Sequence, residues 1–310
     1  MDTRLDVDGA LPLAHWGLIR ARGADAASFL QGQLTNDVLQ LDATTARLAG
    51  FCSAKGRLQA SFVIWKLAPD DLLLACAASV LAATLKRLSM FVLRARCKLS
   101  DAGAEFALHG IAGASARGLI GDTPVWGRRE IADGSLLRLP DADGVARCMI
   151  ALAAGAALPA LPVLAPDRWR ELEVRSGIPL IEAATADQFV PQMLNYEIIG
   201  GVDFRKGCYP GQEIVARSQY RGTIKRRMFL FEADAALAAG QEVFHSGDAA
   251  QPAGMVVNAA PLPGAGAVAL VEVKLAAIDT GELRAGAPDG ALLRRCELPY
   301  ELPLDATLPG

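Results

Sequence analysis

The stretch Asp203–Gly222, with the sequence DFRKGCYPGQEIVARSQYRG, is the part of the chain from which the rest can be arranged. Glycine before Cys208 and a Pro-Gly pair soon after it predict a tight, exposed turn. Pro210 suits the first position of a helix, because its missing N–H would have no partner there. Glu213 then falls in the first helical turn, where the helix dipole favours an acid. We therefore expect a helix from about Pro210 to about Arg221, with Cys208 just before its N-terminus.

This placement bears on the chemistry of Cys208. A helix N-terminus and nearby cations stabilise a thiolate over a thiol, and Lys206 lies two residues before the cysteine. The first interpretation is therefore an accessible, reactive thiol. The second is a buried, inert cysteine that only happens to precede a helix, since unpaired cysteines are often buried. The flanking glycines, proline and cations bring the two interpretations close to balance.

The run 206–213, KGCYPGQE, resembles the K-G-C-Y-x-G-Q-E signature of the YgfZ family, folate-binding proteins related to T-protein, the aminomethyltransferase of the glycine cleavage system. The similarity extends upstream through 189–204 and downstream through 214–226. The runs FLQGQLTNDV (29–38) and CSAKGR (52–57) also resemble the family. The resemblance implies a T-protein-like α+β fold. Two α+β subdomains would surround a central cavity for a reduced folate, with a small C-terminal β-barrel and the Cys208 turn at or near the cavity mouth.

The resemblance also implies a function, namely a tetrahydrofolate-binding protein that assists iron–sulfur cluster assembly or repair in client enzymes, including enzymes that modify tRNA. Cys208 would be the functional thiol and Lys206 its electrostatic activator, while Tyr209 and Glu213 would shape the site. Iron–sulfur client or assembly proteins would be its partners. A non-catalytic folate-binding scaffold, with the KGCY motif as a docking surface, stays open as an alternative.

A second alternative is a folate-dependent aminomethyl or one-carbon transferase like T-protein. That family carries an acid/base aspartate in a strand-to-helix segment of the form N-A-x-N-x-x-x-D. The equivalent segment here, 76–83, contains neither asparagine nor aspartate, and 76–85 carries no carboxylate. The segment cannot perform that proton transfer, which counts against aminomethyl transfer.

Seven polar side chains are candidates for the folate site: Gln31, Asn36, Lys55, Arg57, Glu182, Gln192 and Asn195. The amide groups of Gln192 and Asn195 suit the edge of a pterin. Lys55 and Arg57 lie in the expected hairpin turn of the CSAKGR run and could meet the anionic tail of a folate. The run 29–38 would help to wall the cavity. For each residue the alternative is an ordinary role in solvation or in loop hydrogen bonding.

Length and composition narrow the class of protein. The 310 residues are 52% hydrophobic and 21% charged, which indicates two or three domains with a sizeable core. The net charge of −3 gives no global reason to expect direct nucleic-acid binding. The six cysteines and three histidines show no metal-site spacing, and the scattered cysteines suit a reducing compartment.

The sequence shows neither a targeting segment nor a membrane span. The N-terminus is acidic and lacks a hydrophobic core, so it resembles neither a signal nor a transit peptide. The longest apolar run, 72–85, is shorter than the ~20 residues needed to span a bilayer. We therefore expect a cytoplasmic protein with no membrane partner and no resident metal.

The remaining segments alternate between strands and helices. We expect strands at 13–22, on both sides of the turn 54–57, and at 71–76, 94–99, 105–109 and 135–152. Helices are expected at 24–35, 77–89, 113–119 and 167–176, the last with Asp167 as N-cap. After Gly222, short strands at 227–231, 242–245, 254–258, 267–274 and 292–296 indicate a small barrel or sandwich. We place a domain boundary near Thr223, between an α+β region of two subdomains (1–222) and a C-terminal β-barrel (223–310).

Overall fold

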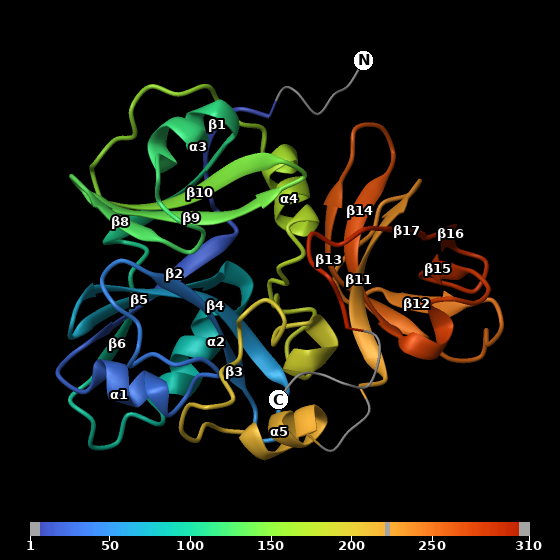
Figure 1. Cartoon of the computed structure of the whole chain (residues 1–310), viewed down its shortest axis with the longest axis horizontal. Coiled ribbons are helices and arrows are strands. Elements are labelled where there is room, and N and C mark those ends of the chain that lie inside the picture. Colours follow the sequence, from blue (N-terminus) through green and yellow to red (C-terminus); the bar gives the residue numbers. More distant parts are fainter. Residues whose placement is uncertain (1–6, 221–223, 304–310) are drawn as a thin grey trace.

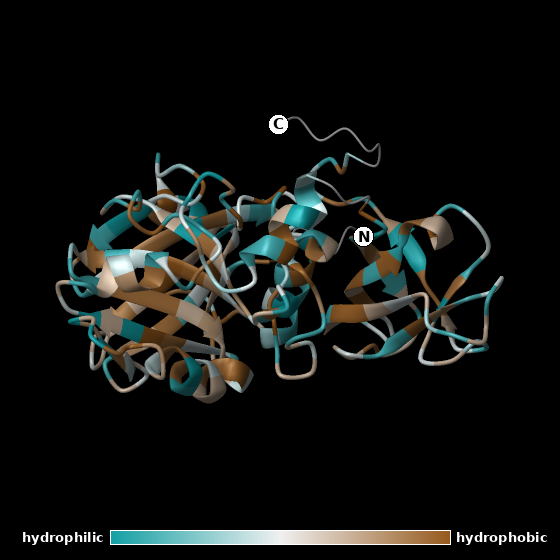
Figure 2. Ribbon diagram, turned by 90° about the horizontal axis from the view of Figure 1, so that it is seen from below, coloured by the Kyte–Doolittle hydropathy of each residue, from teal (hydrophilic) through white to brown (hydrophobic). Residues whose placement is uncertain are grey.

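The computed structural model describes residues 7–220 and 224–303. Its strands form three antiparallel sheets, two stacked on each other and one curved into a small barrel beside them (Figure 1). In Figure 2 most of the hydrophobic colour lies on the strands, and most of the hydrophilic colour lies on the loops. This distribution places the cores inside and between the sheets.

The first sheet of the stacked pair comes from residues 16–101. Its strand order is β3 (Ala46–Cys52), β4 (Leu58–Ala68), β5 (Asp71–Ala77), β2 (Trp16–Arg22) and β6 (Lys98–Asp101). Helices α1 (Ala26–Gln31) and α2 (Ala78–Ser89) cover its outer face through an apolar cluster that includes Leu30, Leu74 and Val80. Both faces of β4 and β5 are buried, which explains their nearly continuous apolar sequences.

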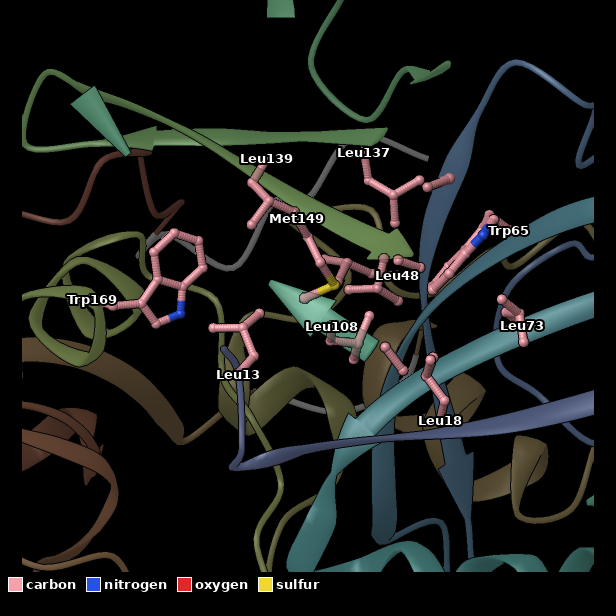
Figure 3. Close-up of a cluster of buried hydrophobic side chains, with 14 of the residues drawn as sticks. Leu13, Leu18, Leu48, Trp65, Leu73, Leu108, Leu137, Leu139, Met149 and Trp169 are labelled. Carbon is pink, nitrogen blue, oxygen red and sulfur yellow. The ribbon is translucent and has the colours of Figure 1, made fainter. Parts of the chain in front are cut away.

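The second sheet joins the first strand of the chain to a later segment. Its order is β1 (Gly9–Pro12), β7 (Phe106–Ala112), β10 (Val145–Ala153), β9 (Gly134–Ala142) and β8 (Arg128–Ile131). Helix α3 (Gly113–Ile120) covers its outer face. The inner faces of the two sheets meet in one core, where Leu48 and Trp65 of the first sheet approach Leu108, Leu139 and Met149 of the second (Figure 3).

The curved sheet forms the C-terminal barrel, in the order β16, β15, β12, β13, β14, β11 and β17. These strands span Ala291–Leu292, Leu283–Ala285, Glu242–His245, Gly254–Pro261, Ala267–Lys274, Arg226–Ala233 and Arg294–Cys296. Helix α4 (Pro166–Arg175) packs between the barrel and the stacked sheets. Short 3-10 helices lie at Pro191–Leu194 and Leu275–Ala277, and α5 spans Gln212–Tyr220.

Most of the expected elements are present. The α+β fold with a C-terminal barrel is confirmed, and the strands at 242–245 and 267–274 match residue for residue. The strand expected at 94–99 is wrong in position, because 90–97 form turns and bends and β6 begins only at Lys98. The expected helix 24–35 is shorter and ends at Gln31. Strands β1, β8 and β15 are additions to the expected set.

Two predicted helix starts also differ from the structure. Ala165, not Asp167, occupies the N-cap of α4, because Pro166 takes the first helical position and leaves Asp167 inside the first turn. Helix α5 begins at Gln212 rather than Pro210, after a turn formed by Pro210 and Gly211. The boundary expected near Thr223 lies outside the described residues.

Candidate functional site

The Cys208 turn packs directly against the turn of the β3–β4 hairpin. Gly211 has a φ of +79°, and a Cβ atom there would lie 2.4 Å from the Ser53 carbonyl oxygen and 2.7 Å from the Gly56 Cα. Gly56 also has a positive φ, of +69°, and a Cβ on it would meet Ile214. Both positions therefore need glycine. Two sequence motifs about 150 residues apart interlock through their glycines.

Lys206 joins a third segment to this turn. Its ammonium group donates hydrogen bonds to the backbone carbonyl oxygens of Gln31 and Leu34, the latter at 2.6 Å. The Nζ atom also lies 5.1 Å from the centre of the Tyr209 ring. Burial lowers the pKa of Lys206 to about 8, although the nearby Asp37, Asp203 and Cys208 raise it. Lys206 thus fastens the turn to the 29–38 run, and any effect it has on Cys208 acts through space.

Cys208 itself is exposed, which confirms the expected exposed turn. Cys52, Cys76 and Cys148 are buried, and burial raises the pKa of each thiol to about 12. Cys97 and Cys296 are half-buried, and burial raises their pKa values too. Of the six cysteines, Cys208 is therefore the one that is exposed to solvent.

Tyr209 and Glu213 follow Cys208 in the motif and differ in burial. Tyr209 is buried, and burial raises the pKa of its phenol. Glu213 is exposed in the first turn of α5. Their part in any chemistry stays a prediction.

A cavity lies between the two stacked sheets and α4. Its enclosed volume is about 50 Å³, so the space is narrow. Its walls are mainly aromatic and aliphatic, with two charged side chains and three hydroxyls. The lining residues are Trp16, Leu48, Ser61, Phe62, Val63, Trp126, Leu139, Arg147, Met149, Glu173, Ser176, Ile178, Pro179, Leu180 and Tyr196. The lining combines apolar walls with a few polar groups, as in small-molecule sites, although the space is smaller than such sites usually are.

Glu173 is the carboxylate of this cavity. It accepts hydrogen bonds from the Trp16 indole at 2.7 Å and from Nε2 of His15 at 2.8 Å. Burial alone would raise the pKa of Glu173, but the bonds from His15 and Trp16 outweigh burial and leave the pKa lowered. The cavity therefore holds an ionised carboxylate in a fixed orientation.

Arg147 supplies the opposite charge. Its guanidinium is buried and donates to the Pro140 carbonyl oxygen, with Nε and Nη2 at 3.2 and 3.0 Å. It lies 5.7 Å from the Trp169 ring centre, and burial lowers its pKa to about 10. Among the described residues no carboxylate comes within ion-pair distance of it. A buried guanidinium without an ionic partner costs folding free energy, and it offers donor groups to a ligand.

The seven residues that we expected at the folate site lie outside the cavity walls. Gln192 donates to the Val215 carbonyl oxygen, and Asn195 donates to that of Met228, each at 2.8 Å. Both amides therefore support the backbone around the Cys208 turn and the barrel. Contact between these two residues and a pterin stays a prediction.

The other five residues have local roles. The Gln31 side chain accepts from the Val38 N–H, and that of Asn36 donates to the Leu48 and Gly200 carbonyl oxygens. The run 29–38 thus packs beneath the Cys208 turn rather than along the cavity. Arg57 donates to the backbone oxygen of Gln188, Lys55 is exposed at the hairpin tip, and Glu182 lies 3.5 Å from Arg170.

The sequence signal for Glu173 was present but weak. Trp169 and Glu173 are four residues apart on α4, so they share a helix face. However, the surrounding run of alternating acidic and basic residues is also typical of a solvent-exposed helix, so the sequence alone does not single out Glu173. The strand-to-helix segment is as expected: α2 begins at Ala78 without an acidic residue in its first turn.

Comparison with known proteins identifies the family of the chain. Residues 8–124 match the family model of the GCVT N-terminal domain. The tRNA-modifying protein YgfZ of Edwardsiella ictaluri is 35% identical over 237 residues, which cover 70% of this chain and 69% of that protein. The chain belongs to the YgfZ family. The Escherichia coli O127:H6 protein of the same name is 30% identical over 236 residues, covering 73% of this chain and 72% of the relative.

A solved structure shows the same fold. The glycine cleavage system aminomethyltransferase T from Bartonella henselae superposes with a TM-score of 0.71, over 97% of this chain and 87% of the other, at 17% sequence identity. Within the described parts of this YgfZ protein, no three His, Cys, Asp or Glu side chains converge as a metal site requires. No helix in those parts is both long and apolar enough to cross a bilayer.

Proposed function

We propose that this YgfZ protein binds a reduced folate, tetrahydrofolate, in the cavity between its stacked sheets. We further propose that it uses the Cys208 thiol to assist iron–sulfur cluster assembly or repair in client enzymes of the cytoplasm. Relatives are named tRNA-modifying proteins, so enzymes that modify tRNA are the first clients to test. The observation that carries the folate proposal is that one aromatic-walled space holds both an ionised Glu173 and a buried Arg147 for which the described residues supply no carboxylate partner.

The residues of the cavity fit a pterin. The rings of Trp16, Trp126 and Tyr196 suit the faces of a flat heterocycle. The Glu173 carboxylate can accept hydrogen bonds from ring N–H and amino groups, and Arg147 can donate to a ring carbonyl oxygen. A reduced folate supplies a carrier of one-carbon units. Here the chain's own residues orient the ring and keep water away from it.

Calorimetric titration with tetrahydrofolate tests this assignment. Glu173→Gln keeps the size of the side chain and removes its charge, so we expect affinity to fall by about 10- to 100-fold. Glu213→Gln is the matched control, because Glu213 is exposed near Cys208 and should leave the affinity unchanged. Failure of the wild-type protein to bind, or equal affinity in the Glu173→Gln protein, would refute the folate site.

The Cys208 thiol is proposed as the group that meets a client or its cluster, with the cluster as cargo. Its exposure at an interlocked turn supports this role, because the sulfur is reachable while its backbone is held. In cells that lack the gene, Cys208→Ser should restore iron–sulfur enzyme activity and the dependent tRNA modifications poorly. Cys97→Ser, at a half-buried cysteine, is the control and should restore them fully.

The same experiments separate the alternatives. Full support by Cys208→Ser, with folate binding intact, would favour the non-catalytic scaffold. Aminomethyl turnover with tetrahydrofolate would favour a T-protein-like transferase, in which Glu173 and His15 would be the cavity's acid/base pair. We expect binding without turnover, because α2 starts without the acid that T-protein places there.

A further inference from the structure

The segment 86–98, from the last turn of α2 to the first residue of β6, exposes apolar side chains to solvent. Leu93 is 86% exposed, Met90 60% and Phe91 39%. These three large side chains lie within four consecutive positions of an irregular loop. Single exposed apolar residues are normal, but a contiguous group is typical of a contact surface.

The same segment is strongly basic. Residues 72–100 contain no aspartate or glutamate, and five lysines and arginines fall within 86–98: Lys86, Arg87, Arg94, Arg96 and Lys98. All five are exposed. Arg96 pairs with Asp25 at 3.2 Å on the neighbouring α1 segment, while Arg87 lies over the Phe91 ring at 5.2 Å. In a chain of net charge −3, this concentration of positive charge is local.

Folding accounts for only part of this pattern. Lys86 and Arg87 in the last turn of α2 complement the negative end of the helix dipole. Arg94 and Lys98 lie beyond the helix, so that explanation does not reach them. The exposure of Met90 and Leu93 contributes nothing to the core and opposes solubility. Exposed apolar and basic side chains together therefore indicate a binding partner that can contact both kinds of group.

We propose that the segment 86–98 rests on an anionic lipid surface, with Met90, Phe91 and Leu93 at the acyl boundary and the cations against the headgroups. A fluid surface accepts an irregular loop, and its binding strength sums buried apolar area and attraction to anionic lipid. This contact is peripheral. It differs from the sequence-based expectation of no membrane partner, which rested on the lack of a targeting peptide and of an apolar run long enough to span a bilayer.

Other polyanions fit the segment less well. Nucleic acid would engage the cations but leave Met90 and Leu93 without a role, and the Phe91 ring already has Arg87 over it. An acidic protein groove would need a contact area of about 800 Å² on this side, more than one short loop offers. The inference stands on the segment alone and does not depend on the folate or cysteine proposals.

Vesicle co-sedimentation tests the proposal, with phosphatidylcholine vesicles prepared with and without phosphatidylglycerol. We expect binding only when phosphatidylglycerol is present, weakening as salt is raised. Leu93→Asp should lower the partition coefficient at least about tenfold, as should Arg94→Glu combined with Lys98→Glu. These side chains are exposed, so circular dichroism should show the variants folded as the wild type.

Two control variants match these changes elsewhere on the surface. Val163→Asp alters another highly exposed apolar side chain, 91% accessible, and Arg117→Glu reverses an exposed cation on α3. Both should bind vesicles as the wild type does. The proposal is overturned if the wild type binds neither vesicle, or if Leu93→Asp binds undiminished. Binding of tRNA that the segment variants abolish, without vesicle binding, would also overturn it in favour of nucleic acid.

Discussion

Replacing Gly211 with alanine tests whether the two glycine turns are truly interlocked. The new Cβ would lie 2.4 Å from the Ser53 carbonyl oxygen and 2.7 Å from backbone atoms of Gly56, so backbone rather than a flexible side chain would have to move. The φ of +79° adds a second cost, because L-residues avoid this region. Both effects act at the base of the Cys208 turn.

The two costs can be added. A non-glycine residue in the left-handed region costs about 1–2 kcal/mol, and overpacking against atoms that cannot easily yield costs about 1–3 kcal/mol. We expect Gly211→Ala to reduce the free energy of unfolding by about 2–5 kcal/mol. For a chain of this size that corresponds to a fall in Tm of about 4 °C or more.

Gly207 provides the matched control within the same turn. A Cβ there would meet no heavy atom within 4 Å, and its φ is not in the positive region. Gly207→Ala should therefore unfold near the wild-type temperature. Thermal unfolding followed by circular dichroism compares the two variants. Equal stability of Gly211→Ala and Gly207→Ala would show that the turns are not held together as described.

Three further predictions concern the buried charges. Burial lowers the pKa of Lys206 from 10.5 to about 8, so the folded state disfavours its charge. Relative to Lys206→Met, the free energy of unfolding of the wild type should therefore rise between about pH 8 and 10.5, by at most about 1.4 kcal/mol per pH unit. Urea titrations at several pH values measure this rise. Glu173 has a lowered pKa, so its contribution to stability is present above about pH 4.5 and is lost as the pH falls through the folded-state value. The stabilities of the wild type and of Glu173→Gln should therefore converge in acid. A difference in stability that stays constant with pH would contradict this. Arg147 is buried without an ionic partner in the described part of the chain, so Arg147→Met should leave the ligand-free protein at least as stable as the wild type. The same variant should weaken tetrahydrofolate binding about tenfold. A large loss of stability would show that Arg147 serves the fold instead.

Local sequence signals were sufficient for much of the architecture. The turn 54–57 between two β-rich runs, the helix after Cys76 and the barrel strands at 242–245 and 267–274 all follow from short-range patterns, and the structure has them. The segment 94–99 misled because its alternation of apolar and basic residues imitates a half-buried strand. Its arginines are exposed on an irregular loop, with Arg96 bound to Asp25 instead of lying in a sheet.

The two candidate sites, the Cys208 turn and the cavity, differ in how much of each the sequence could predict. The exposed turn at Cys208 could be predicted because glycine permits and proline fixes the backbone angles of a turn, whereas the sequence left an exposed and a buried thiol close to balance. The cavity could not, since Trp16, Arg147 and Glu173 come from three distant segments that only the tertiary fold brings together. The amide nitrogens of Gln192 and Asn195 looked available in sequence, but they donate to backbone carbonyl oxygens more than 20 residues away, and only the two amide oxygens have no partner among the described residues.

The pairing of β1 with β7 has a consequence for how the protein is made. Gly9 aligns with Ala112, so β1 leaves the ribosome about 100 residues before the strand that pairs with it. The sheet built from 16–101 can meanwhile form from contiguous chain. A bulky tag fused close to Gly9 would hinder this late strand pairing. A tag on a long linker is therefore the better choice for producing the protein.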